Sequence, residues 1–138
     1  MCQSSNDVFP TAASLVLYRE TGGLLDALAT LEAAVRERME ALGPVVRIGR
    51  TCLQDAVPLT FGQSLSGYAS LLERTGTQIA AFRKRSATGI LGATAVGTGI
   101  GVQPGFMKRI YRNLSSITGF PCAGIPTPST GCKIPTAP

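Results

Sequence analysis

The sequence predicts an all-α protein, a bundle of long helices with an irregular Pro-rich C-terminal tail. Apolar residues recur at steps of three and four over two long stretches, the spacing that places them on one face of a helix. The composition is 44% hydrophobic but only 6% aromatic, with no Trp. Small aliphatic side chains must therefore fill the interior, which suits helix–helix packing.

The first helix is expected to follow the polar segment 1–11 and to end near Leu42. Residues 4–7, "SSND", are all good N-cap candidates. The dipeptide "GP" at 43–44 stops the helix. Its apolar stripe consists of Leu17, Leu24, Leu28, Leu31, Val35, Met39 and Leu42.

The stretch "GRTCLQDAVP", residues 49–58, is expected to form a polar loop after this helix. Pro58 suits the opening of a second helix, which should run from about Leu59 to about Arg85. The apolar steps of four and three along it are typical of a coiled-coil seam. The seam consists of Phe61, Leu65, Tyr68, Leu72, Thr75, Ile79 and Phe82.

The remaining chain is predicted to hold a Gly/Thr-rich loop, "GATAVGTGIG" at 92–101, and a third helix from Pro104 to Thr118. Gly119 would cap that helix. Residues 121–138 are rich in proline and lack a helical period, so they are expected to be an irregular or disordered tail after a helical domain over 1–120. Three helices barely enclose a core, so oligomerisation or further helices are implied.

The composition argues against several functional classes. The chain has no His, the commonest general acid or base. Its four Cys form no CxxC pair, which does not favour a metal site, and no signal peptide opens the chain, so a cytoplasmic location with reduced thiols is predicted. The charge of +5 is spread along the chain, which does not favour nucleic-acid binding. The uncharged segment 88–102 is shorter than the roughly 20 residues of a membrane span.

Two polar stretches could carry chemistry. "QSSND" places two hydroxyls and an amide at a helix N-terminus, where free N–H groups attract anions. This arrangement suits a carboxylate, and plain N-capping is the alternative. In the second stretch, Arg50 and Thr51 are donors that also suit a carboxylate. Cys52 could be a nucleophile, a metal ligand, or a small neutral residue that lines a pocket or packs beneath it. The third interpretation is favoured, because no His or Lys adjoins Cys52 to generate a thiolate.

The Gly-rich loop is not a nucleotide site on its sequence, because "GATAVGTG" lacks the Lys of a phosphate loop and the spacing of GxGxxG. Its glycines are expected to let the backbone approach a ligand or another chain.

Three blocks together resemble a known family. "CQSSNDVFPTA", "GRTCLQDAVPLTFGQ" and "GATAVGTGIG" occur in the order and spacing of the aspartase/fumarase superfamily. The resemblance covers about residues 2–122. Within the superfamily the chain looks most like the aspartate ammonia-lyases, on "LQDAVP", "GATA" and "TGFPC", with the class II fumarases close behind.

The resemblance implies a homotetramer in which each subunit gives helices to a central bundle and active sites form where three subunits meet. It implies a small dicarboxylate substrate, aspartate or malate, and β-elimination of ammonia or water to give fumarate. No cofactor and no metal are implied. Carried over by position, the substrate-binding residues are Ser4, Ser5, Asn6, Thr51 and Cys52, the last as a weak donor where many members have His.

The family's base, a Ser on a loop with the signature "GSSxMPxKxNP", has no counterpart in this sequence. No residue of the chain is therefore predicted to be catalytic. We expect the chain to be an internal fragment of the central helical domain that is inactive alone. The alternatives are a fragment of a class II fumarase, a non-catalytic helical oligomerisation remnant and, less favoured, anion binding driven by the positive charge.

Overall fold

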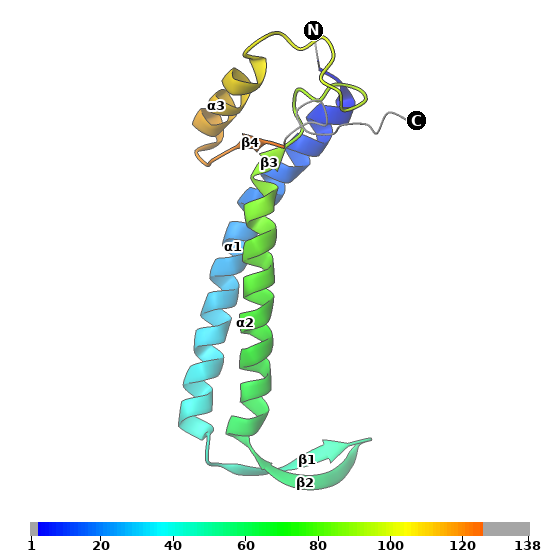
Figure 1. The fold of residues 1–138 in the computed structure, drawn as a ribbon. Coiled ribbons are helices and arrows are strands. Elements are labelled where there is room, and N and C mark those ends of the chain that lie inside the picture. Colours follow the sequence, from blue (N-terminus) through cyan, green and yellow to red (C-terminus); the bar gives the residue numbers. More distant parts are fainter. Residues whose placement is uncertain (1–2, 126–138) are drawn as a thin grey trace, which may run out of the picture. The chain divides into compact units, whose positions relative to one another are not determined.

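The computed structural model describes residues 3–125, and these are mainly helical (Figure 1). This confirms the predicted fold class. The elements in chain order are helix α1 (Ser5–Leu42), strands β1 (Val46–Thr51) and β2 (Gln54–Thr60), helix α2 (Phe61–Ser86), strand β3 (Thr88–Gly89), helix α3 (Phe106–Thr118) and strand β4 (Ala123–Gly124). Most of the predicted tail, 126–138, lies outside the described residues, as do Cys2 and Cys132.

The described chain forms two compact units. Unit 1 contains the described residues up to Glu20 and those from Phe82 onward, and unit 2 contains Thr21–Ala81. Helices α1 and α2 each contribute to both units. Among residues 3–125, no helix combines the length and the apolar character that a membrane span requires.

The predicted polar loop at residues 49–58 is wrong, because residues 46–60 of unit 2 form a β-hairpin. Strands β1 and β2 pair antiparallel, from Val46 opposite Thr60 to Thr51 opposite Gln54. The register shifts between Ile48 and Arg50, and a Cβ on Gly49 at this irregularity would lie 2.8 Å from the carbonyl oxygen of Val57. The β-branched residues in 45–60 favour strand over loop, which the local abundance of polar residues concealed.

The second helix begins two residues later than the predicted start at about Leu59, and Pro58 does not open it. Pro58 lies in β2, opposite Ile48, and α2 begins three residues later at Phe61. Thr60 and Gln63 form a reciprocal capping box: the Gln63 amide donates to Thr60 Oγ1 at 3.1 Å, and the Thr60 amide donates to Gln63 Oε1 at 2.9 Å. This pair satisfies two donors at the helix start, and so sets its position.

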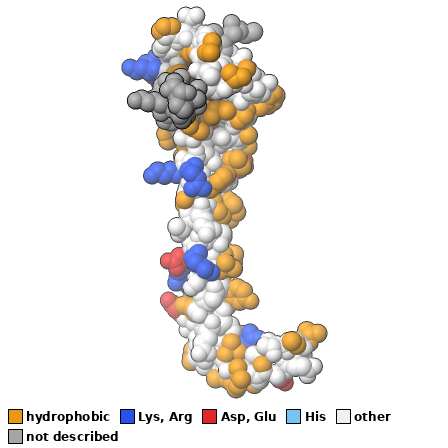
Figure 2. All heavy atoms as spheres, turned by 45° about the vertical axis from the view of Figure 1, so that its right-hand side comes forward, with side chains coloured by type: hydrophobic (Ala, Val, Ile, Leu, Met, Phe, Trp, Pro, Cys, Tyr) orange, Lys and Arg blue, Asp and Glu red, His pale blue; other side chains and the backbone are white. Residues whose placement is uncertain are grey.

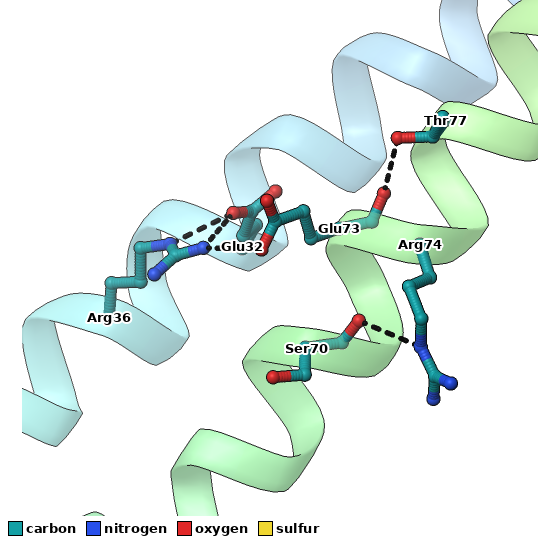
Figure 3. A network of polar contacts seen from close by, with 6 residues as sticks. All are labelled: Glu32, Arg36, Ser70, Glu73, Arg74 and Thr77. Atoms are coloured by element: carbon teal, nitrogen blue, oxygen red, sulfur yellow. Dashed lines mark hydrogen bonds and ion pairs between the residues drawn. The ribbon is translucent and has the colours of Figure 1, made fainter.

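Within unit 2, α1 and α2 lie side by side and are linked by an exposed polar network (Figure 3). The Arg36 guanidinium lies 2.7 Å from Glu32 Oε1 on its own helix and 3.3 Å from Glu73 Oε2 on α2. The Arg74 side chain donates to the Ser70 carbonyl, and the Thr77 hydroxyl to the Glu73 carbonyl. Because most of these groups are exposed, the network contributes little to the stability of the pair.

The predicted apolar stripes are present but incompletely covered in a single chain. In the described part of unit 2, the one buried hydrophobic residue is Ala69. Figure 2 shows hydrophobic side chains exposed along the helices and on the hairpin. The exposed members include Leu24, Leu31, Val46, Ile48, Tyr68 and Leu71. These exposed stripes agree with the expectation that three helices do not enclose a core.

Unit 1 holds most of the buried residues. Its buried apolar side chains are Leu91, Ala93 and Tyr111. Strands β3 and β4 pair in parallel over two residues, which brings residues 123–125 back beside the end of α2. Helix α3 ends at Gly119, in a left-handed conformation with its N–H bonded to the Ser115 carbonyl, so the predicted C-cap is confirmed.

Candidate functional site

The "SSND" segment forms the first turn of α1 and is held by its own capping interactions. The Ser4 hydroxyl accepts a hydrogen bond from the Asn6 amide at 3.2 Å. The Asp7 carboxylate accepts one through Oδ1 from the Ser4 amide at 2.9 Å. The Asp7 contact is the half of a capping box that reaches back to the N-cap amide, whereas the Ser4 hydroxyl bonds the amide of Asn6 and not that of Asp7. The predicted N-cap role is therefore correct. These contacts already use the backbone amides of Ser4 and Asn6, which are then not available to a ligand.

Asp7 is the organising residue of the site, and sequence reasoning treated it as a cap alone. Its side chain is fully buried, and Oδ2 accepts hydrogen bonds from the amides of Gly92 and Thr94, each at 3.0 Å. One carboxylate thus joins the "SSND" turn to the "GAT" part of the Gly-rich loop. None of the ion pairs between described residues includes Asp7, so backbone amides stabilise its charge.

The charge state of Asp7 follows from these contacts. Burial by itself raises the pKa of a carboxyl group, but the amide donors from Ser4, Gly92 and Thr94 together outweigh it and hold the pKa of Asp7 below the ordinary value of 3.8. Asp7 is consequently an anion near neutral pH. Its negative charge lies beneath a turn that was expected to bind a carboxylate.

The Gly-rich loop adopts the conformation that this contact requires. Gly92 and Thr94 have positive φ values of 94° and 66°, a region that a β-branched residue such as Thr94 rarely enters. Their two N–H groups converge on one oxygen, which makes a small anion-binding nest. The chain's own Asp7 fills this nest, so its amides are not open to an external anion.

Two further bonds join α1 to the segment 90–95. The Asn6 side-chain amide donates to the Ala95 carbonyl at 2.9 Å. The Thr11 hydroxyl donates to the Asp7 carbonyl at 2.7 Å and accepts from the Ile90 amide at 3.1 Å. Of the three predicted substrate-binding residues here, Ser5 is exposed and its hydroxyl bonds no described residue. Among the contacts between described residues, the Ser5 hydroxyl is thus the one hydroxyl of the turn without a hydrogen-bond partner.

Tyr111 of α3 bonds the residue that directly precedes the Gly-rich loop. It is buried, and its hydroxyl donates to the Leu91 carbonyl at 3.2 Å. Burial raises the pKa of Tyr111 to about 12, and the nearby Asp7 charge adds to the shift. The phenol is therefore neutral at physiological pH and acts as a hydrogen-bond donor.

Thr51 and Cys52 lie in unit 2, at the tip of the hairpin. Cys52 and Leu53 form the two-residue turn with φ values of 50° and 63°, a turn type that normally selects Asn and Gly. Arg50 pairs with Asp55 across the strands at 3.3 Å. Cys52 is a free, exposed thiol, so it does not pack beneath a pocket within a single chain, and the interpretation that it lines a pocket stays a prediction.

The structure therefore brings some of the predicted residues together. Ser4, Ser5 and Asn6 share one turn with Asp7 in unit 1, while Thr51 and Cys52 share the hairpin tip in unit 2. The S-x-x-D spacing signals a capping box and could have drawn attention to Asp7. Its burial against residues 92–94 depends on tertiary contacts. No group of three or more metal-ligating side chains occurs within residues 3–125.

We expect acid to destabilise the fold through Asp7. Because the pKa of Asp7 is lower in the folded state, the unfolded chain binds its proton more readily. The stabilisation is complete above the unfolded pKa near 3.8 and is lost as the pH falls through the folded pKa. Urea unfolding followed by circular dichroism between about pH 6 and about pH 3 measures this loss. The difference in stability between wild type and Asp7→Asn should shrink over that range, and a constant difference would contradict the assignment.

Comparison with known proteins identifies the family. A family model described as "Lyase" matches residues 1–131. The chain belongs to this lyase family. The chain is 40% identical over 120 residues to the class II fumarate hydratase of Staphylococcus aureus (strain MRSA252) and 36% identical over 124 residues to the aspartate ammonia-lyase of Bacillus subtilis (strain 168). These alignments cover 86% and 90% of this lyase-family chain and 26% of each relative.

A solved structure agrees with the sequence relatives. The fumarate lyase:delta crystallin of Brucella melitensis superposes with a TM-score of 0.80 and 33% identity, over 94% of this chain and 28% of that one. The lyase-family chain is thus a member of the aspartase/fumarase superfamily, as its three sequence blocks indicated. It spans about a quarter of the length of the curated relatives that it matches. Ammonia-lyases and hydratases are similarly close, so the comparisons do not separate them.

Proposed function

We propose that this chain supplies part of the dicarboxylate site of a lyase that forms or consumes fumarate. The observation that carries the proposal is the turn Ser4–Asn6, docked on the Gly-rich loop through Asp7 with the Ser5 hydroxyl left exposed. Neutral donors of this kind hold a carboxylate and stabilise the charge that develops on it during proton abstraction from the adjacent carbon. Loss of one such donor typically raises the barrier by about 3 kcal/mol.

The first candidate reaction is elimination of ammonia from aspartate, as in an aspartate ammonia-lyase. The second is elimination of water from malate, favoured by the 40% identity to a class II fumarate hydratase. Both reactions use the same carboxylate contacts and differ in the leaving group. Ser4, Ser5, Asn6 and Thr51 are the substrate donors that we propose, with Cys52 as a weak donor at a substrate-facing position. We propose no catalytic base within this chain and no cofactor.

Fumarate binding tests this proposal directly. We expect fumarate to shift the amide resonances of Ser5 and Asn6 in NMR spectra of the assembled chain, and we expect Ser5→Ala to weaken that binding. Ser116→Ala is the matched control, because Ser116 is an exposed serine on α3. Equal affinities of the two variants would argue against a substrate role for Ser5. Titration with L-aspartate and L-malate ranks the two candidate substrates.

We expect the purified chain alone to show no turnover of aspartate or malate when fumarate absorbance is followed. The reason is that the chain offers carboxylate donors but no residue that we assign as the base. A clear rate that disappears in Thr51→Ala would show this expectation to be wrong. In that case the chain would contain a complete site of its own.

We also propose that the site is completed by packing between copies of the chain, as a homotetramer. The support is the uncovered apolar stripe of α1, where Leu24 and Leu31 are 48% and 51% exposed. Exposed apolar surface of this kind marks an interaction face. The free thiols of Cys52 and Cys122 fit a cytoplasmic location.

Self-association is the corresponding prediction. We expect light scattering after size-exclusion chromatography to give a mass well above that of one chain. Leu31→Asp should lower it, because a carboxylate on the stripe would be buried without a partner. Ala33→Asp is the matched control, since residue 33 is exposed and lies about 200° around α1 from Leu31. A wild-type protein that remains monomeric at all concentrations would contradict the proposal.

A further inference from the structure

Asp7 differs from its three neighbours in the "SSND" turn. It is the fully buried member, whereas Ser5 and Asn6 are exposed. Its two oxygens also bond different segments: Oδ1 accepts from the Ser4 amide, and Oδ2 accepts from the amides of Gly92 and Thr94. The carboxylate is therefore a joint between two parts of the chain that are about 85 residues apart in sequence.

The Asp7 carboxylate is fully hydrogen-bonded only when the first turn of α1 and the Gly-rich loop are in contact. A buried carboxylate is costly unless hydrogen bonds or an opposite charge satisfy it. No described cation pairs with Asp7, so hydrogen bonds from backbone amides must satisfy its charge. Two of the three amides that donate to its carboxylate come from the loop. The loop in turn holds Thr94 at φ 66°, a conformation that persists only where the surroundings impose it. The Asp7–Thr94 hydrogen bond is one such constraint.

Asn6 is connected to Asp7 indirectly, through the loop. Its side-chain amide donates to the carbonyl of Ala95, the residue next to Thr94. Asn6 does not contact the Asp7 carboxylate in any described hydrogen bond, yet its acceptor belongs to the segment that Asp7 holds. If the loop leaves the helix, Asn6 loses this bond and its side chain is free to change rotamer.

We propose that Asp7 is a positioning residue for the dicarboxylate site, acting through residues 92–95 to fix the side chain of Asn6 and the turn that carries Ser5. The reference to a dicarboxylate rests on the proposed function, whereas the coupling between Asp7 and Asn6 stands on the contacts alone. Asp7 touches no substrate in this assignment. Its negative charge is satisfied by backbone amides within the chain. The exposed side chains of Ser5 and Asn6 are left to contact the ligand.

The electrostatic surroundings of Asp7 are simple enough for a titration to be read. From α3, Tyr111 is the titratable group whose charge is coupled to Asp7. It is neutral throughout the acid range. The donors that face the carboxylate from α1 and from the loop are backbone amides, which do not titrate. A change in this cluster below about pH 5 therefore reports on Asp7 itself.

The test is an NMR titration of the full chain from about pH 6 to about pH 2, following the Asp7 carboxyl carbon, the Gly92 and Thr94 amides, and the Asn6 side-chain amide. We expect the Asn6 side chain to shift with the midpoint of the Asp7 carboxyl group. An Asn6 resonance that stays constant while the Gly92 and Thr94 amides move would overturn the proposal. The Ala69 amide in α2 is the control, because a shift there at the same midpoint would mean global unfolding and would also overturn it.

A variant supplies the functional measurement. We expect Asp7→Asn, with its helical circular dichroism retained, to bind fumarate at least about tenfold more weakly than wild type, whereas Asp26→Asn on the exposed part of α1 should bind normally. A folded Asp7→Asn with wild-type affinity would overturn the positioning role. If wild type itself binds no fumarate, the proposed function is wrong. The titration still tests whether the Asn6 side chain depends on the charge of Asp7. The titration needs no variant, so it also decides the matter where Asp7→Asn does not fold.

Discussion

Asp7→Ala is expected to lower the free energy of unfolding by about 3 to 5 kcal/mol, the largest effect of any single substitution considered. The change removes the acceptor of three amides, those of Ser4, Gly92 and Thr94. Hydrogen bonds to a charged group contribute about 1.5 to 3 kcal/mol each, and a buried donor without a partner adds its own cost. The Gly92 N–H is buried, so water cannot easily replace the lost oxygen.

Asp26→Ala provides the comparison for this experiment. Asp26 is an exposed aspartate on the same helix, so its removal should change stability by no more than about 0.5 kcal/mol. Urea unfolding, followed by circular dichroism and by tyrosine fluorescence, measures both variants. Similar midpoints for the two variants would show that the buried carboxylate contributes no special stability.

Gly89→Ala is expected to be the second most damaging change, with a loss of about 2 to 3 kcal/mol from overpacking. A Cβ at residue 89 would lie 2.5 Å from Cγ2 of Thr11 and 3.0 Å from its Oγ1. Thr11 cannot move aside cheaply, because its hydroxyl bonds both the Asp7 carbonyl and the Ile90 amide. A small residue is therefore required where β3 meets α1.

Two companion variants make this prediction specific. Thr11→Ser removes Cγ2 and retains the hydroxyl, so it should recover part of the loss when combined with Gly89→Ala. Gly76→Ala adds the same methyl group inside α2, where nothing lies within 4 Å of the new Cβ. That variant should gain about 1 kcal/mol, since Ala favours a helix over Gly. Equal effects of the two Gly→Ala changes in thermal unfolding would refute the packing argument.

The helices were predictable because their signal is local and repeated. The apolar steps of three and four over residues 17–42 and 61–82 place side chains on one face whatever the chain packs against. Gly119 could be assigned as a C-cap for the same reason. The hairpin was missed because its Val and Ile residues are few and interleaved with Arg, Gln and Asp, and because Pro58 suggested a helix start. The Thr60–Gln63 capping box was in the sequence but was outweighed by that proline.

Some residues of the candidate site could also be predicted from local sequence, whereas the role of others depends on tertiary contacts. Ser4, Ser5, Asn6 and Thr51 could be named from their blocks, since hydroxyl and amide groups at a helix start are a sequence feature. Asp7 looked like one more cap, because its role depends on a loop about 85 residues away. The exposed position of Cys52 depends on the turn geometry at the hairpin tip, which its polar neighbours did not indicate.

The sequence by itself determined the helical class, the order of the three helices and the membership of the lyase family, because hydrophobic periodicity and residue identity are properties of the chain alone. Only the tertiary structure decided that one carboxylate of the "SSND" turn faces inward and joins the Gly-rich loop. The physical reason is that burial of a charge is settled by the donors that surround it. Those donors are backbone amides, which every residue but proline carries and which no sequence pattern distinguishes.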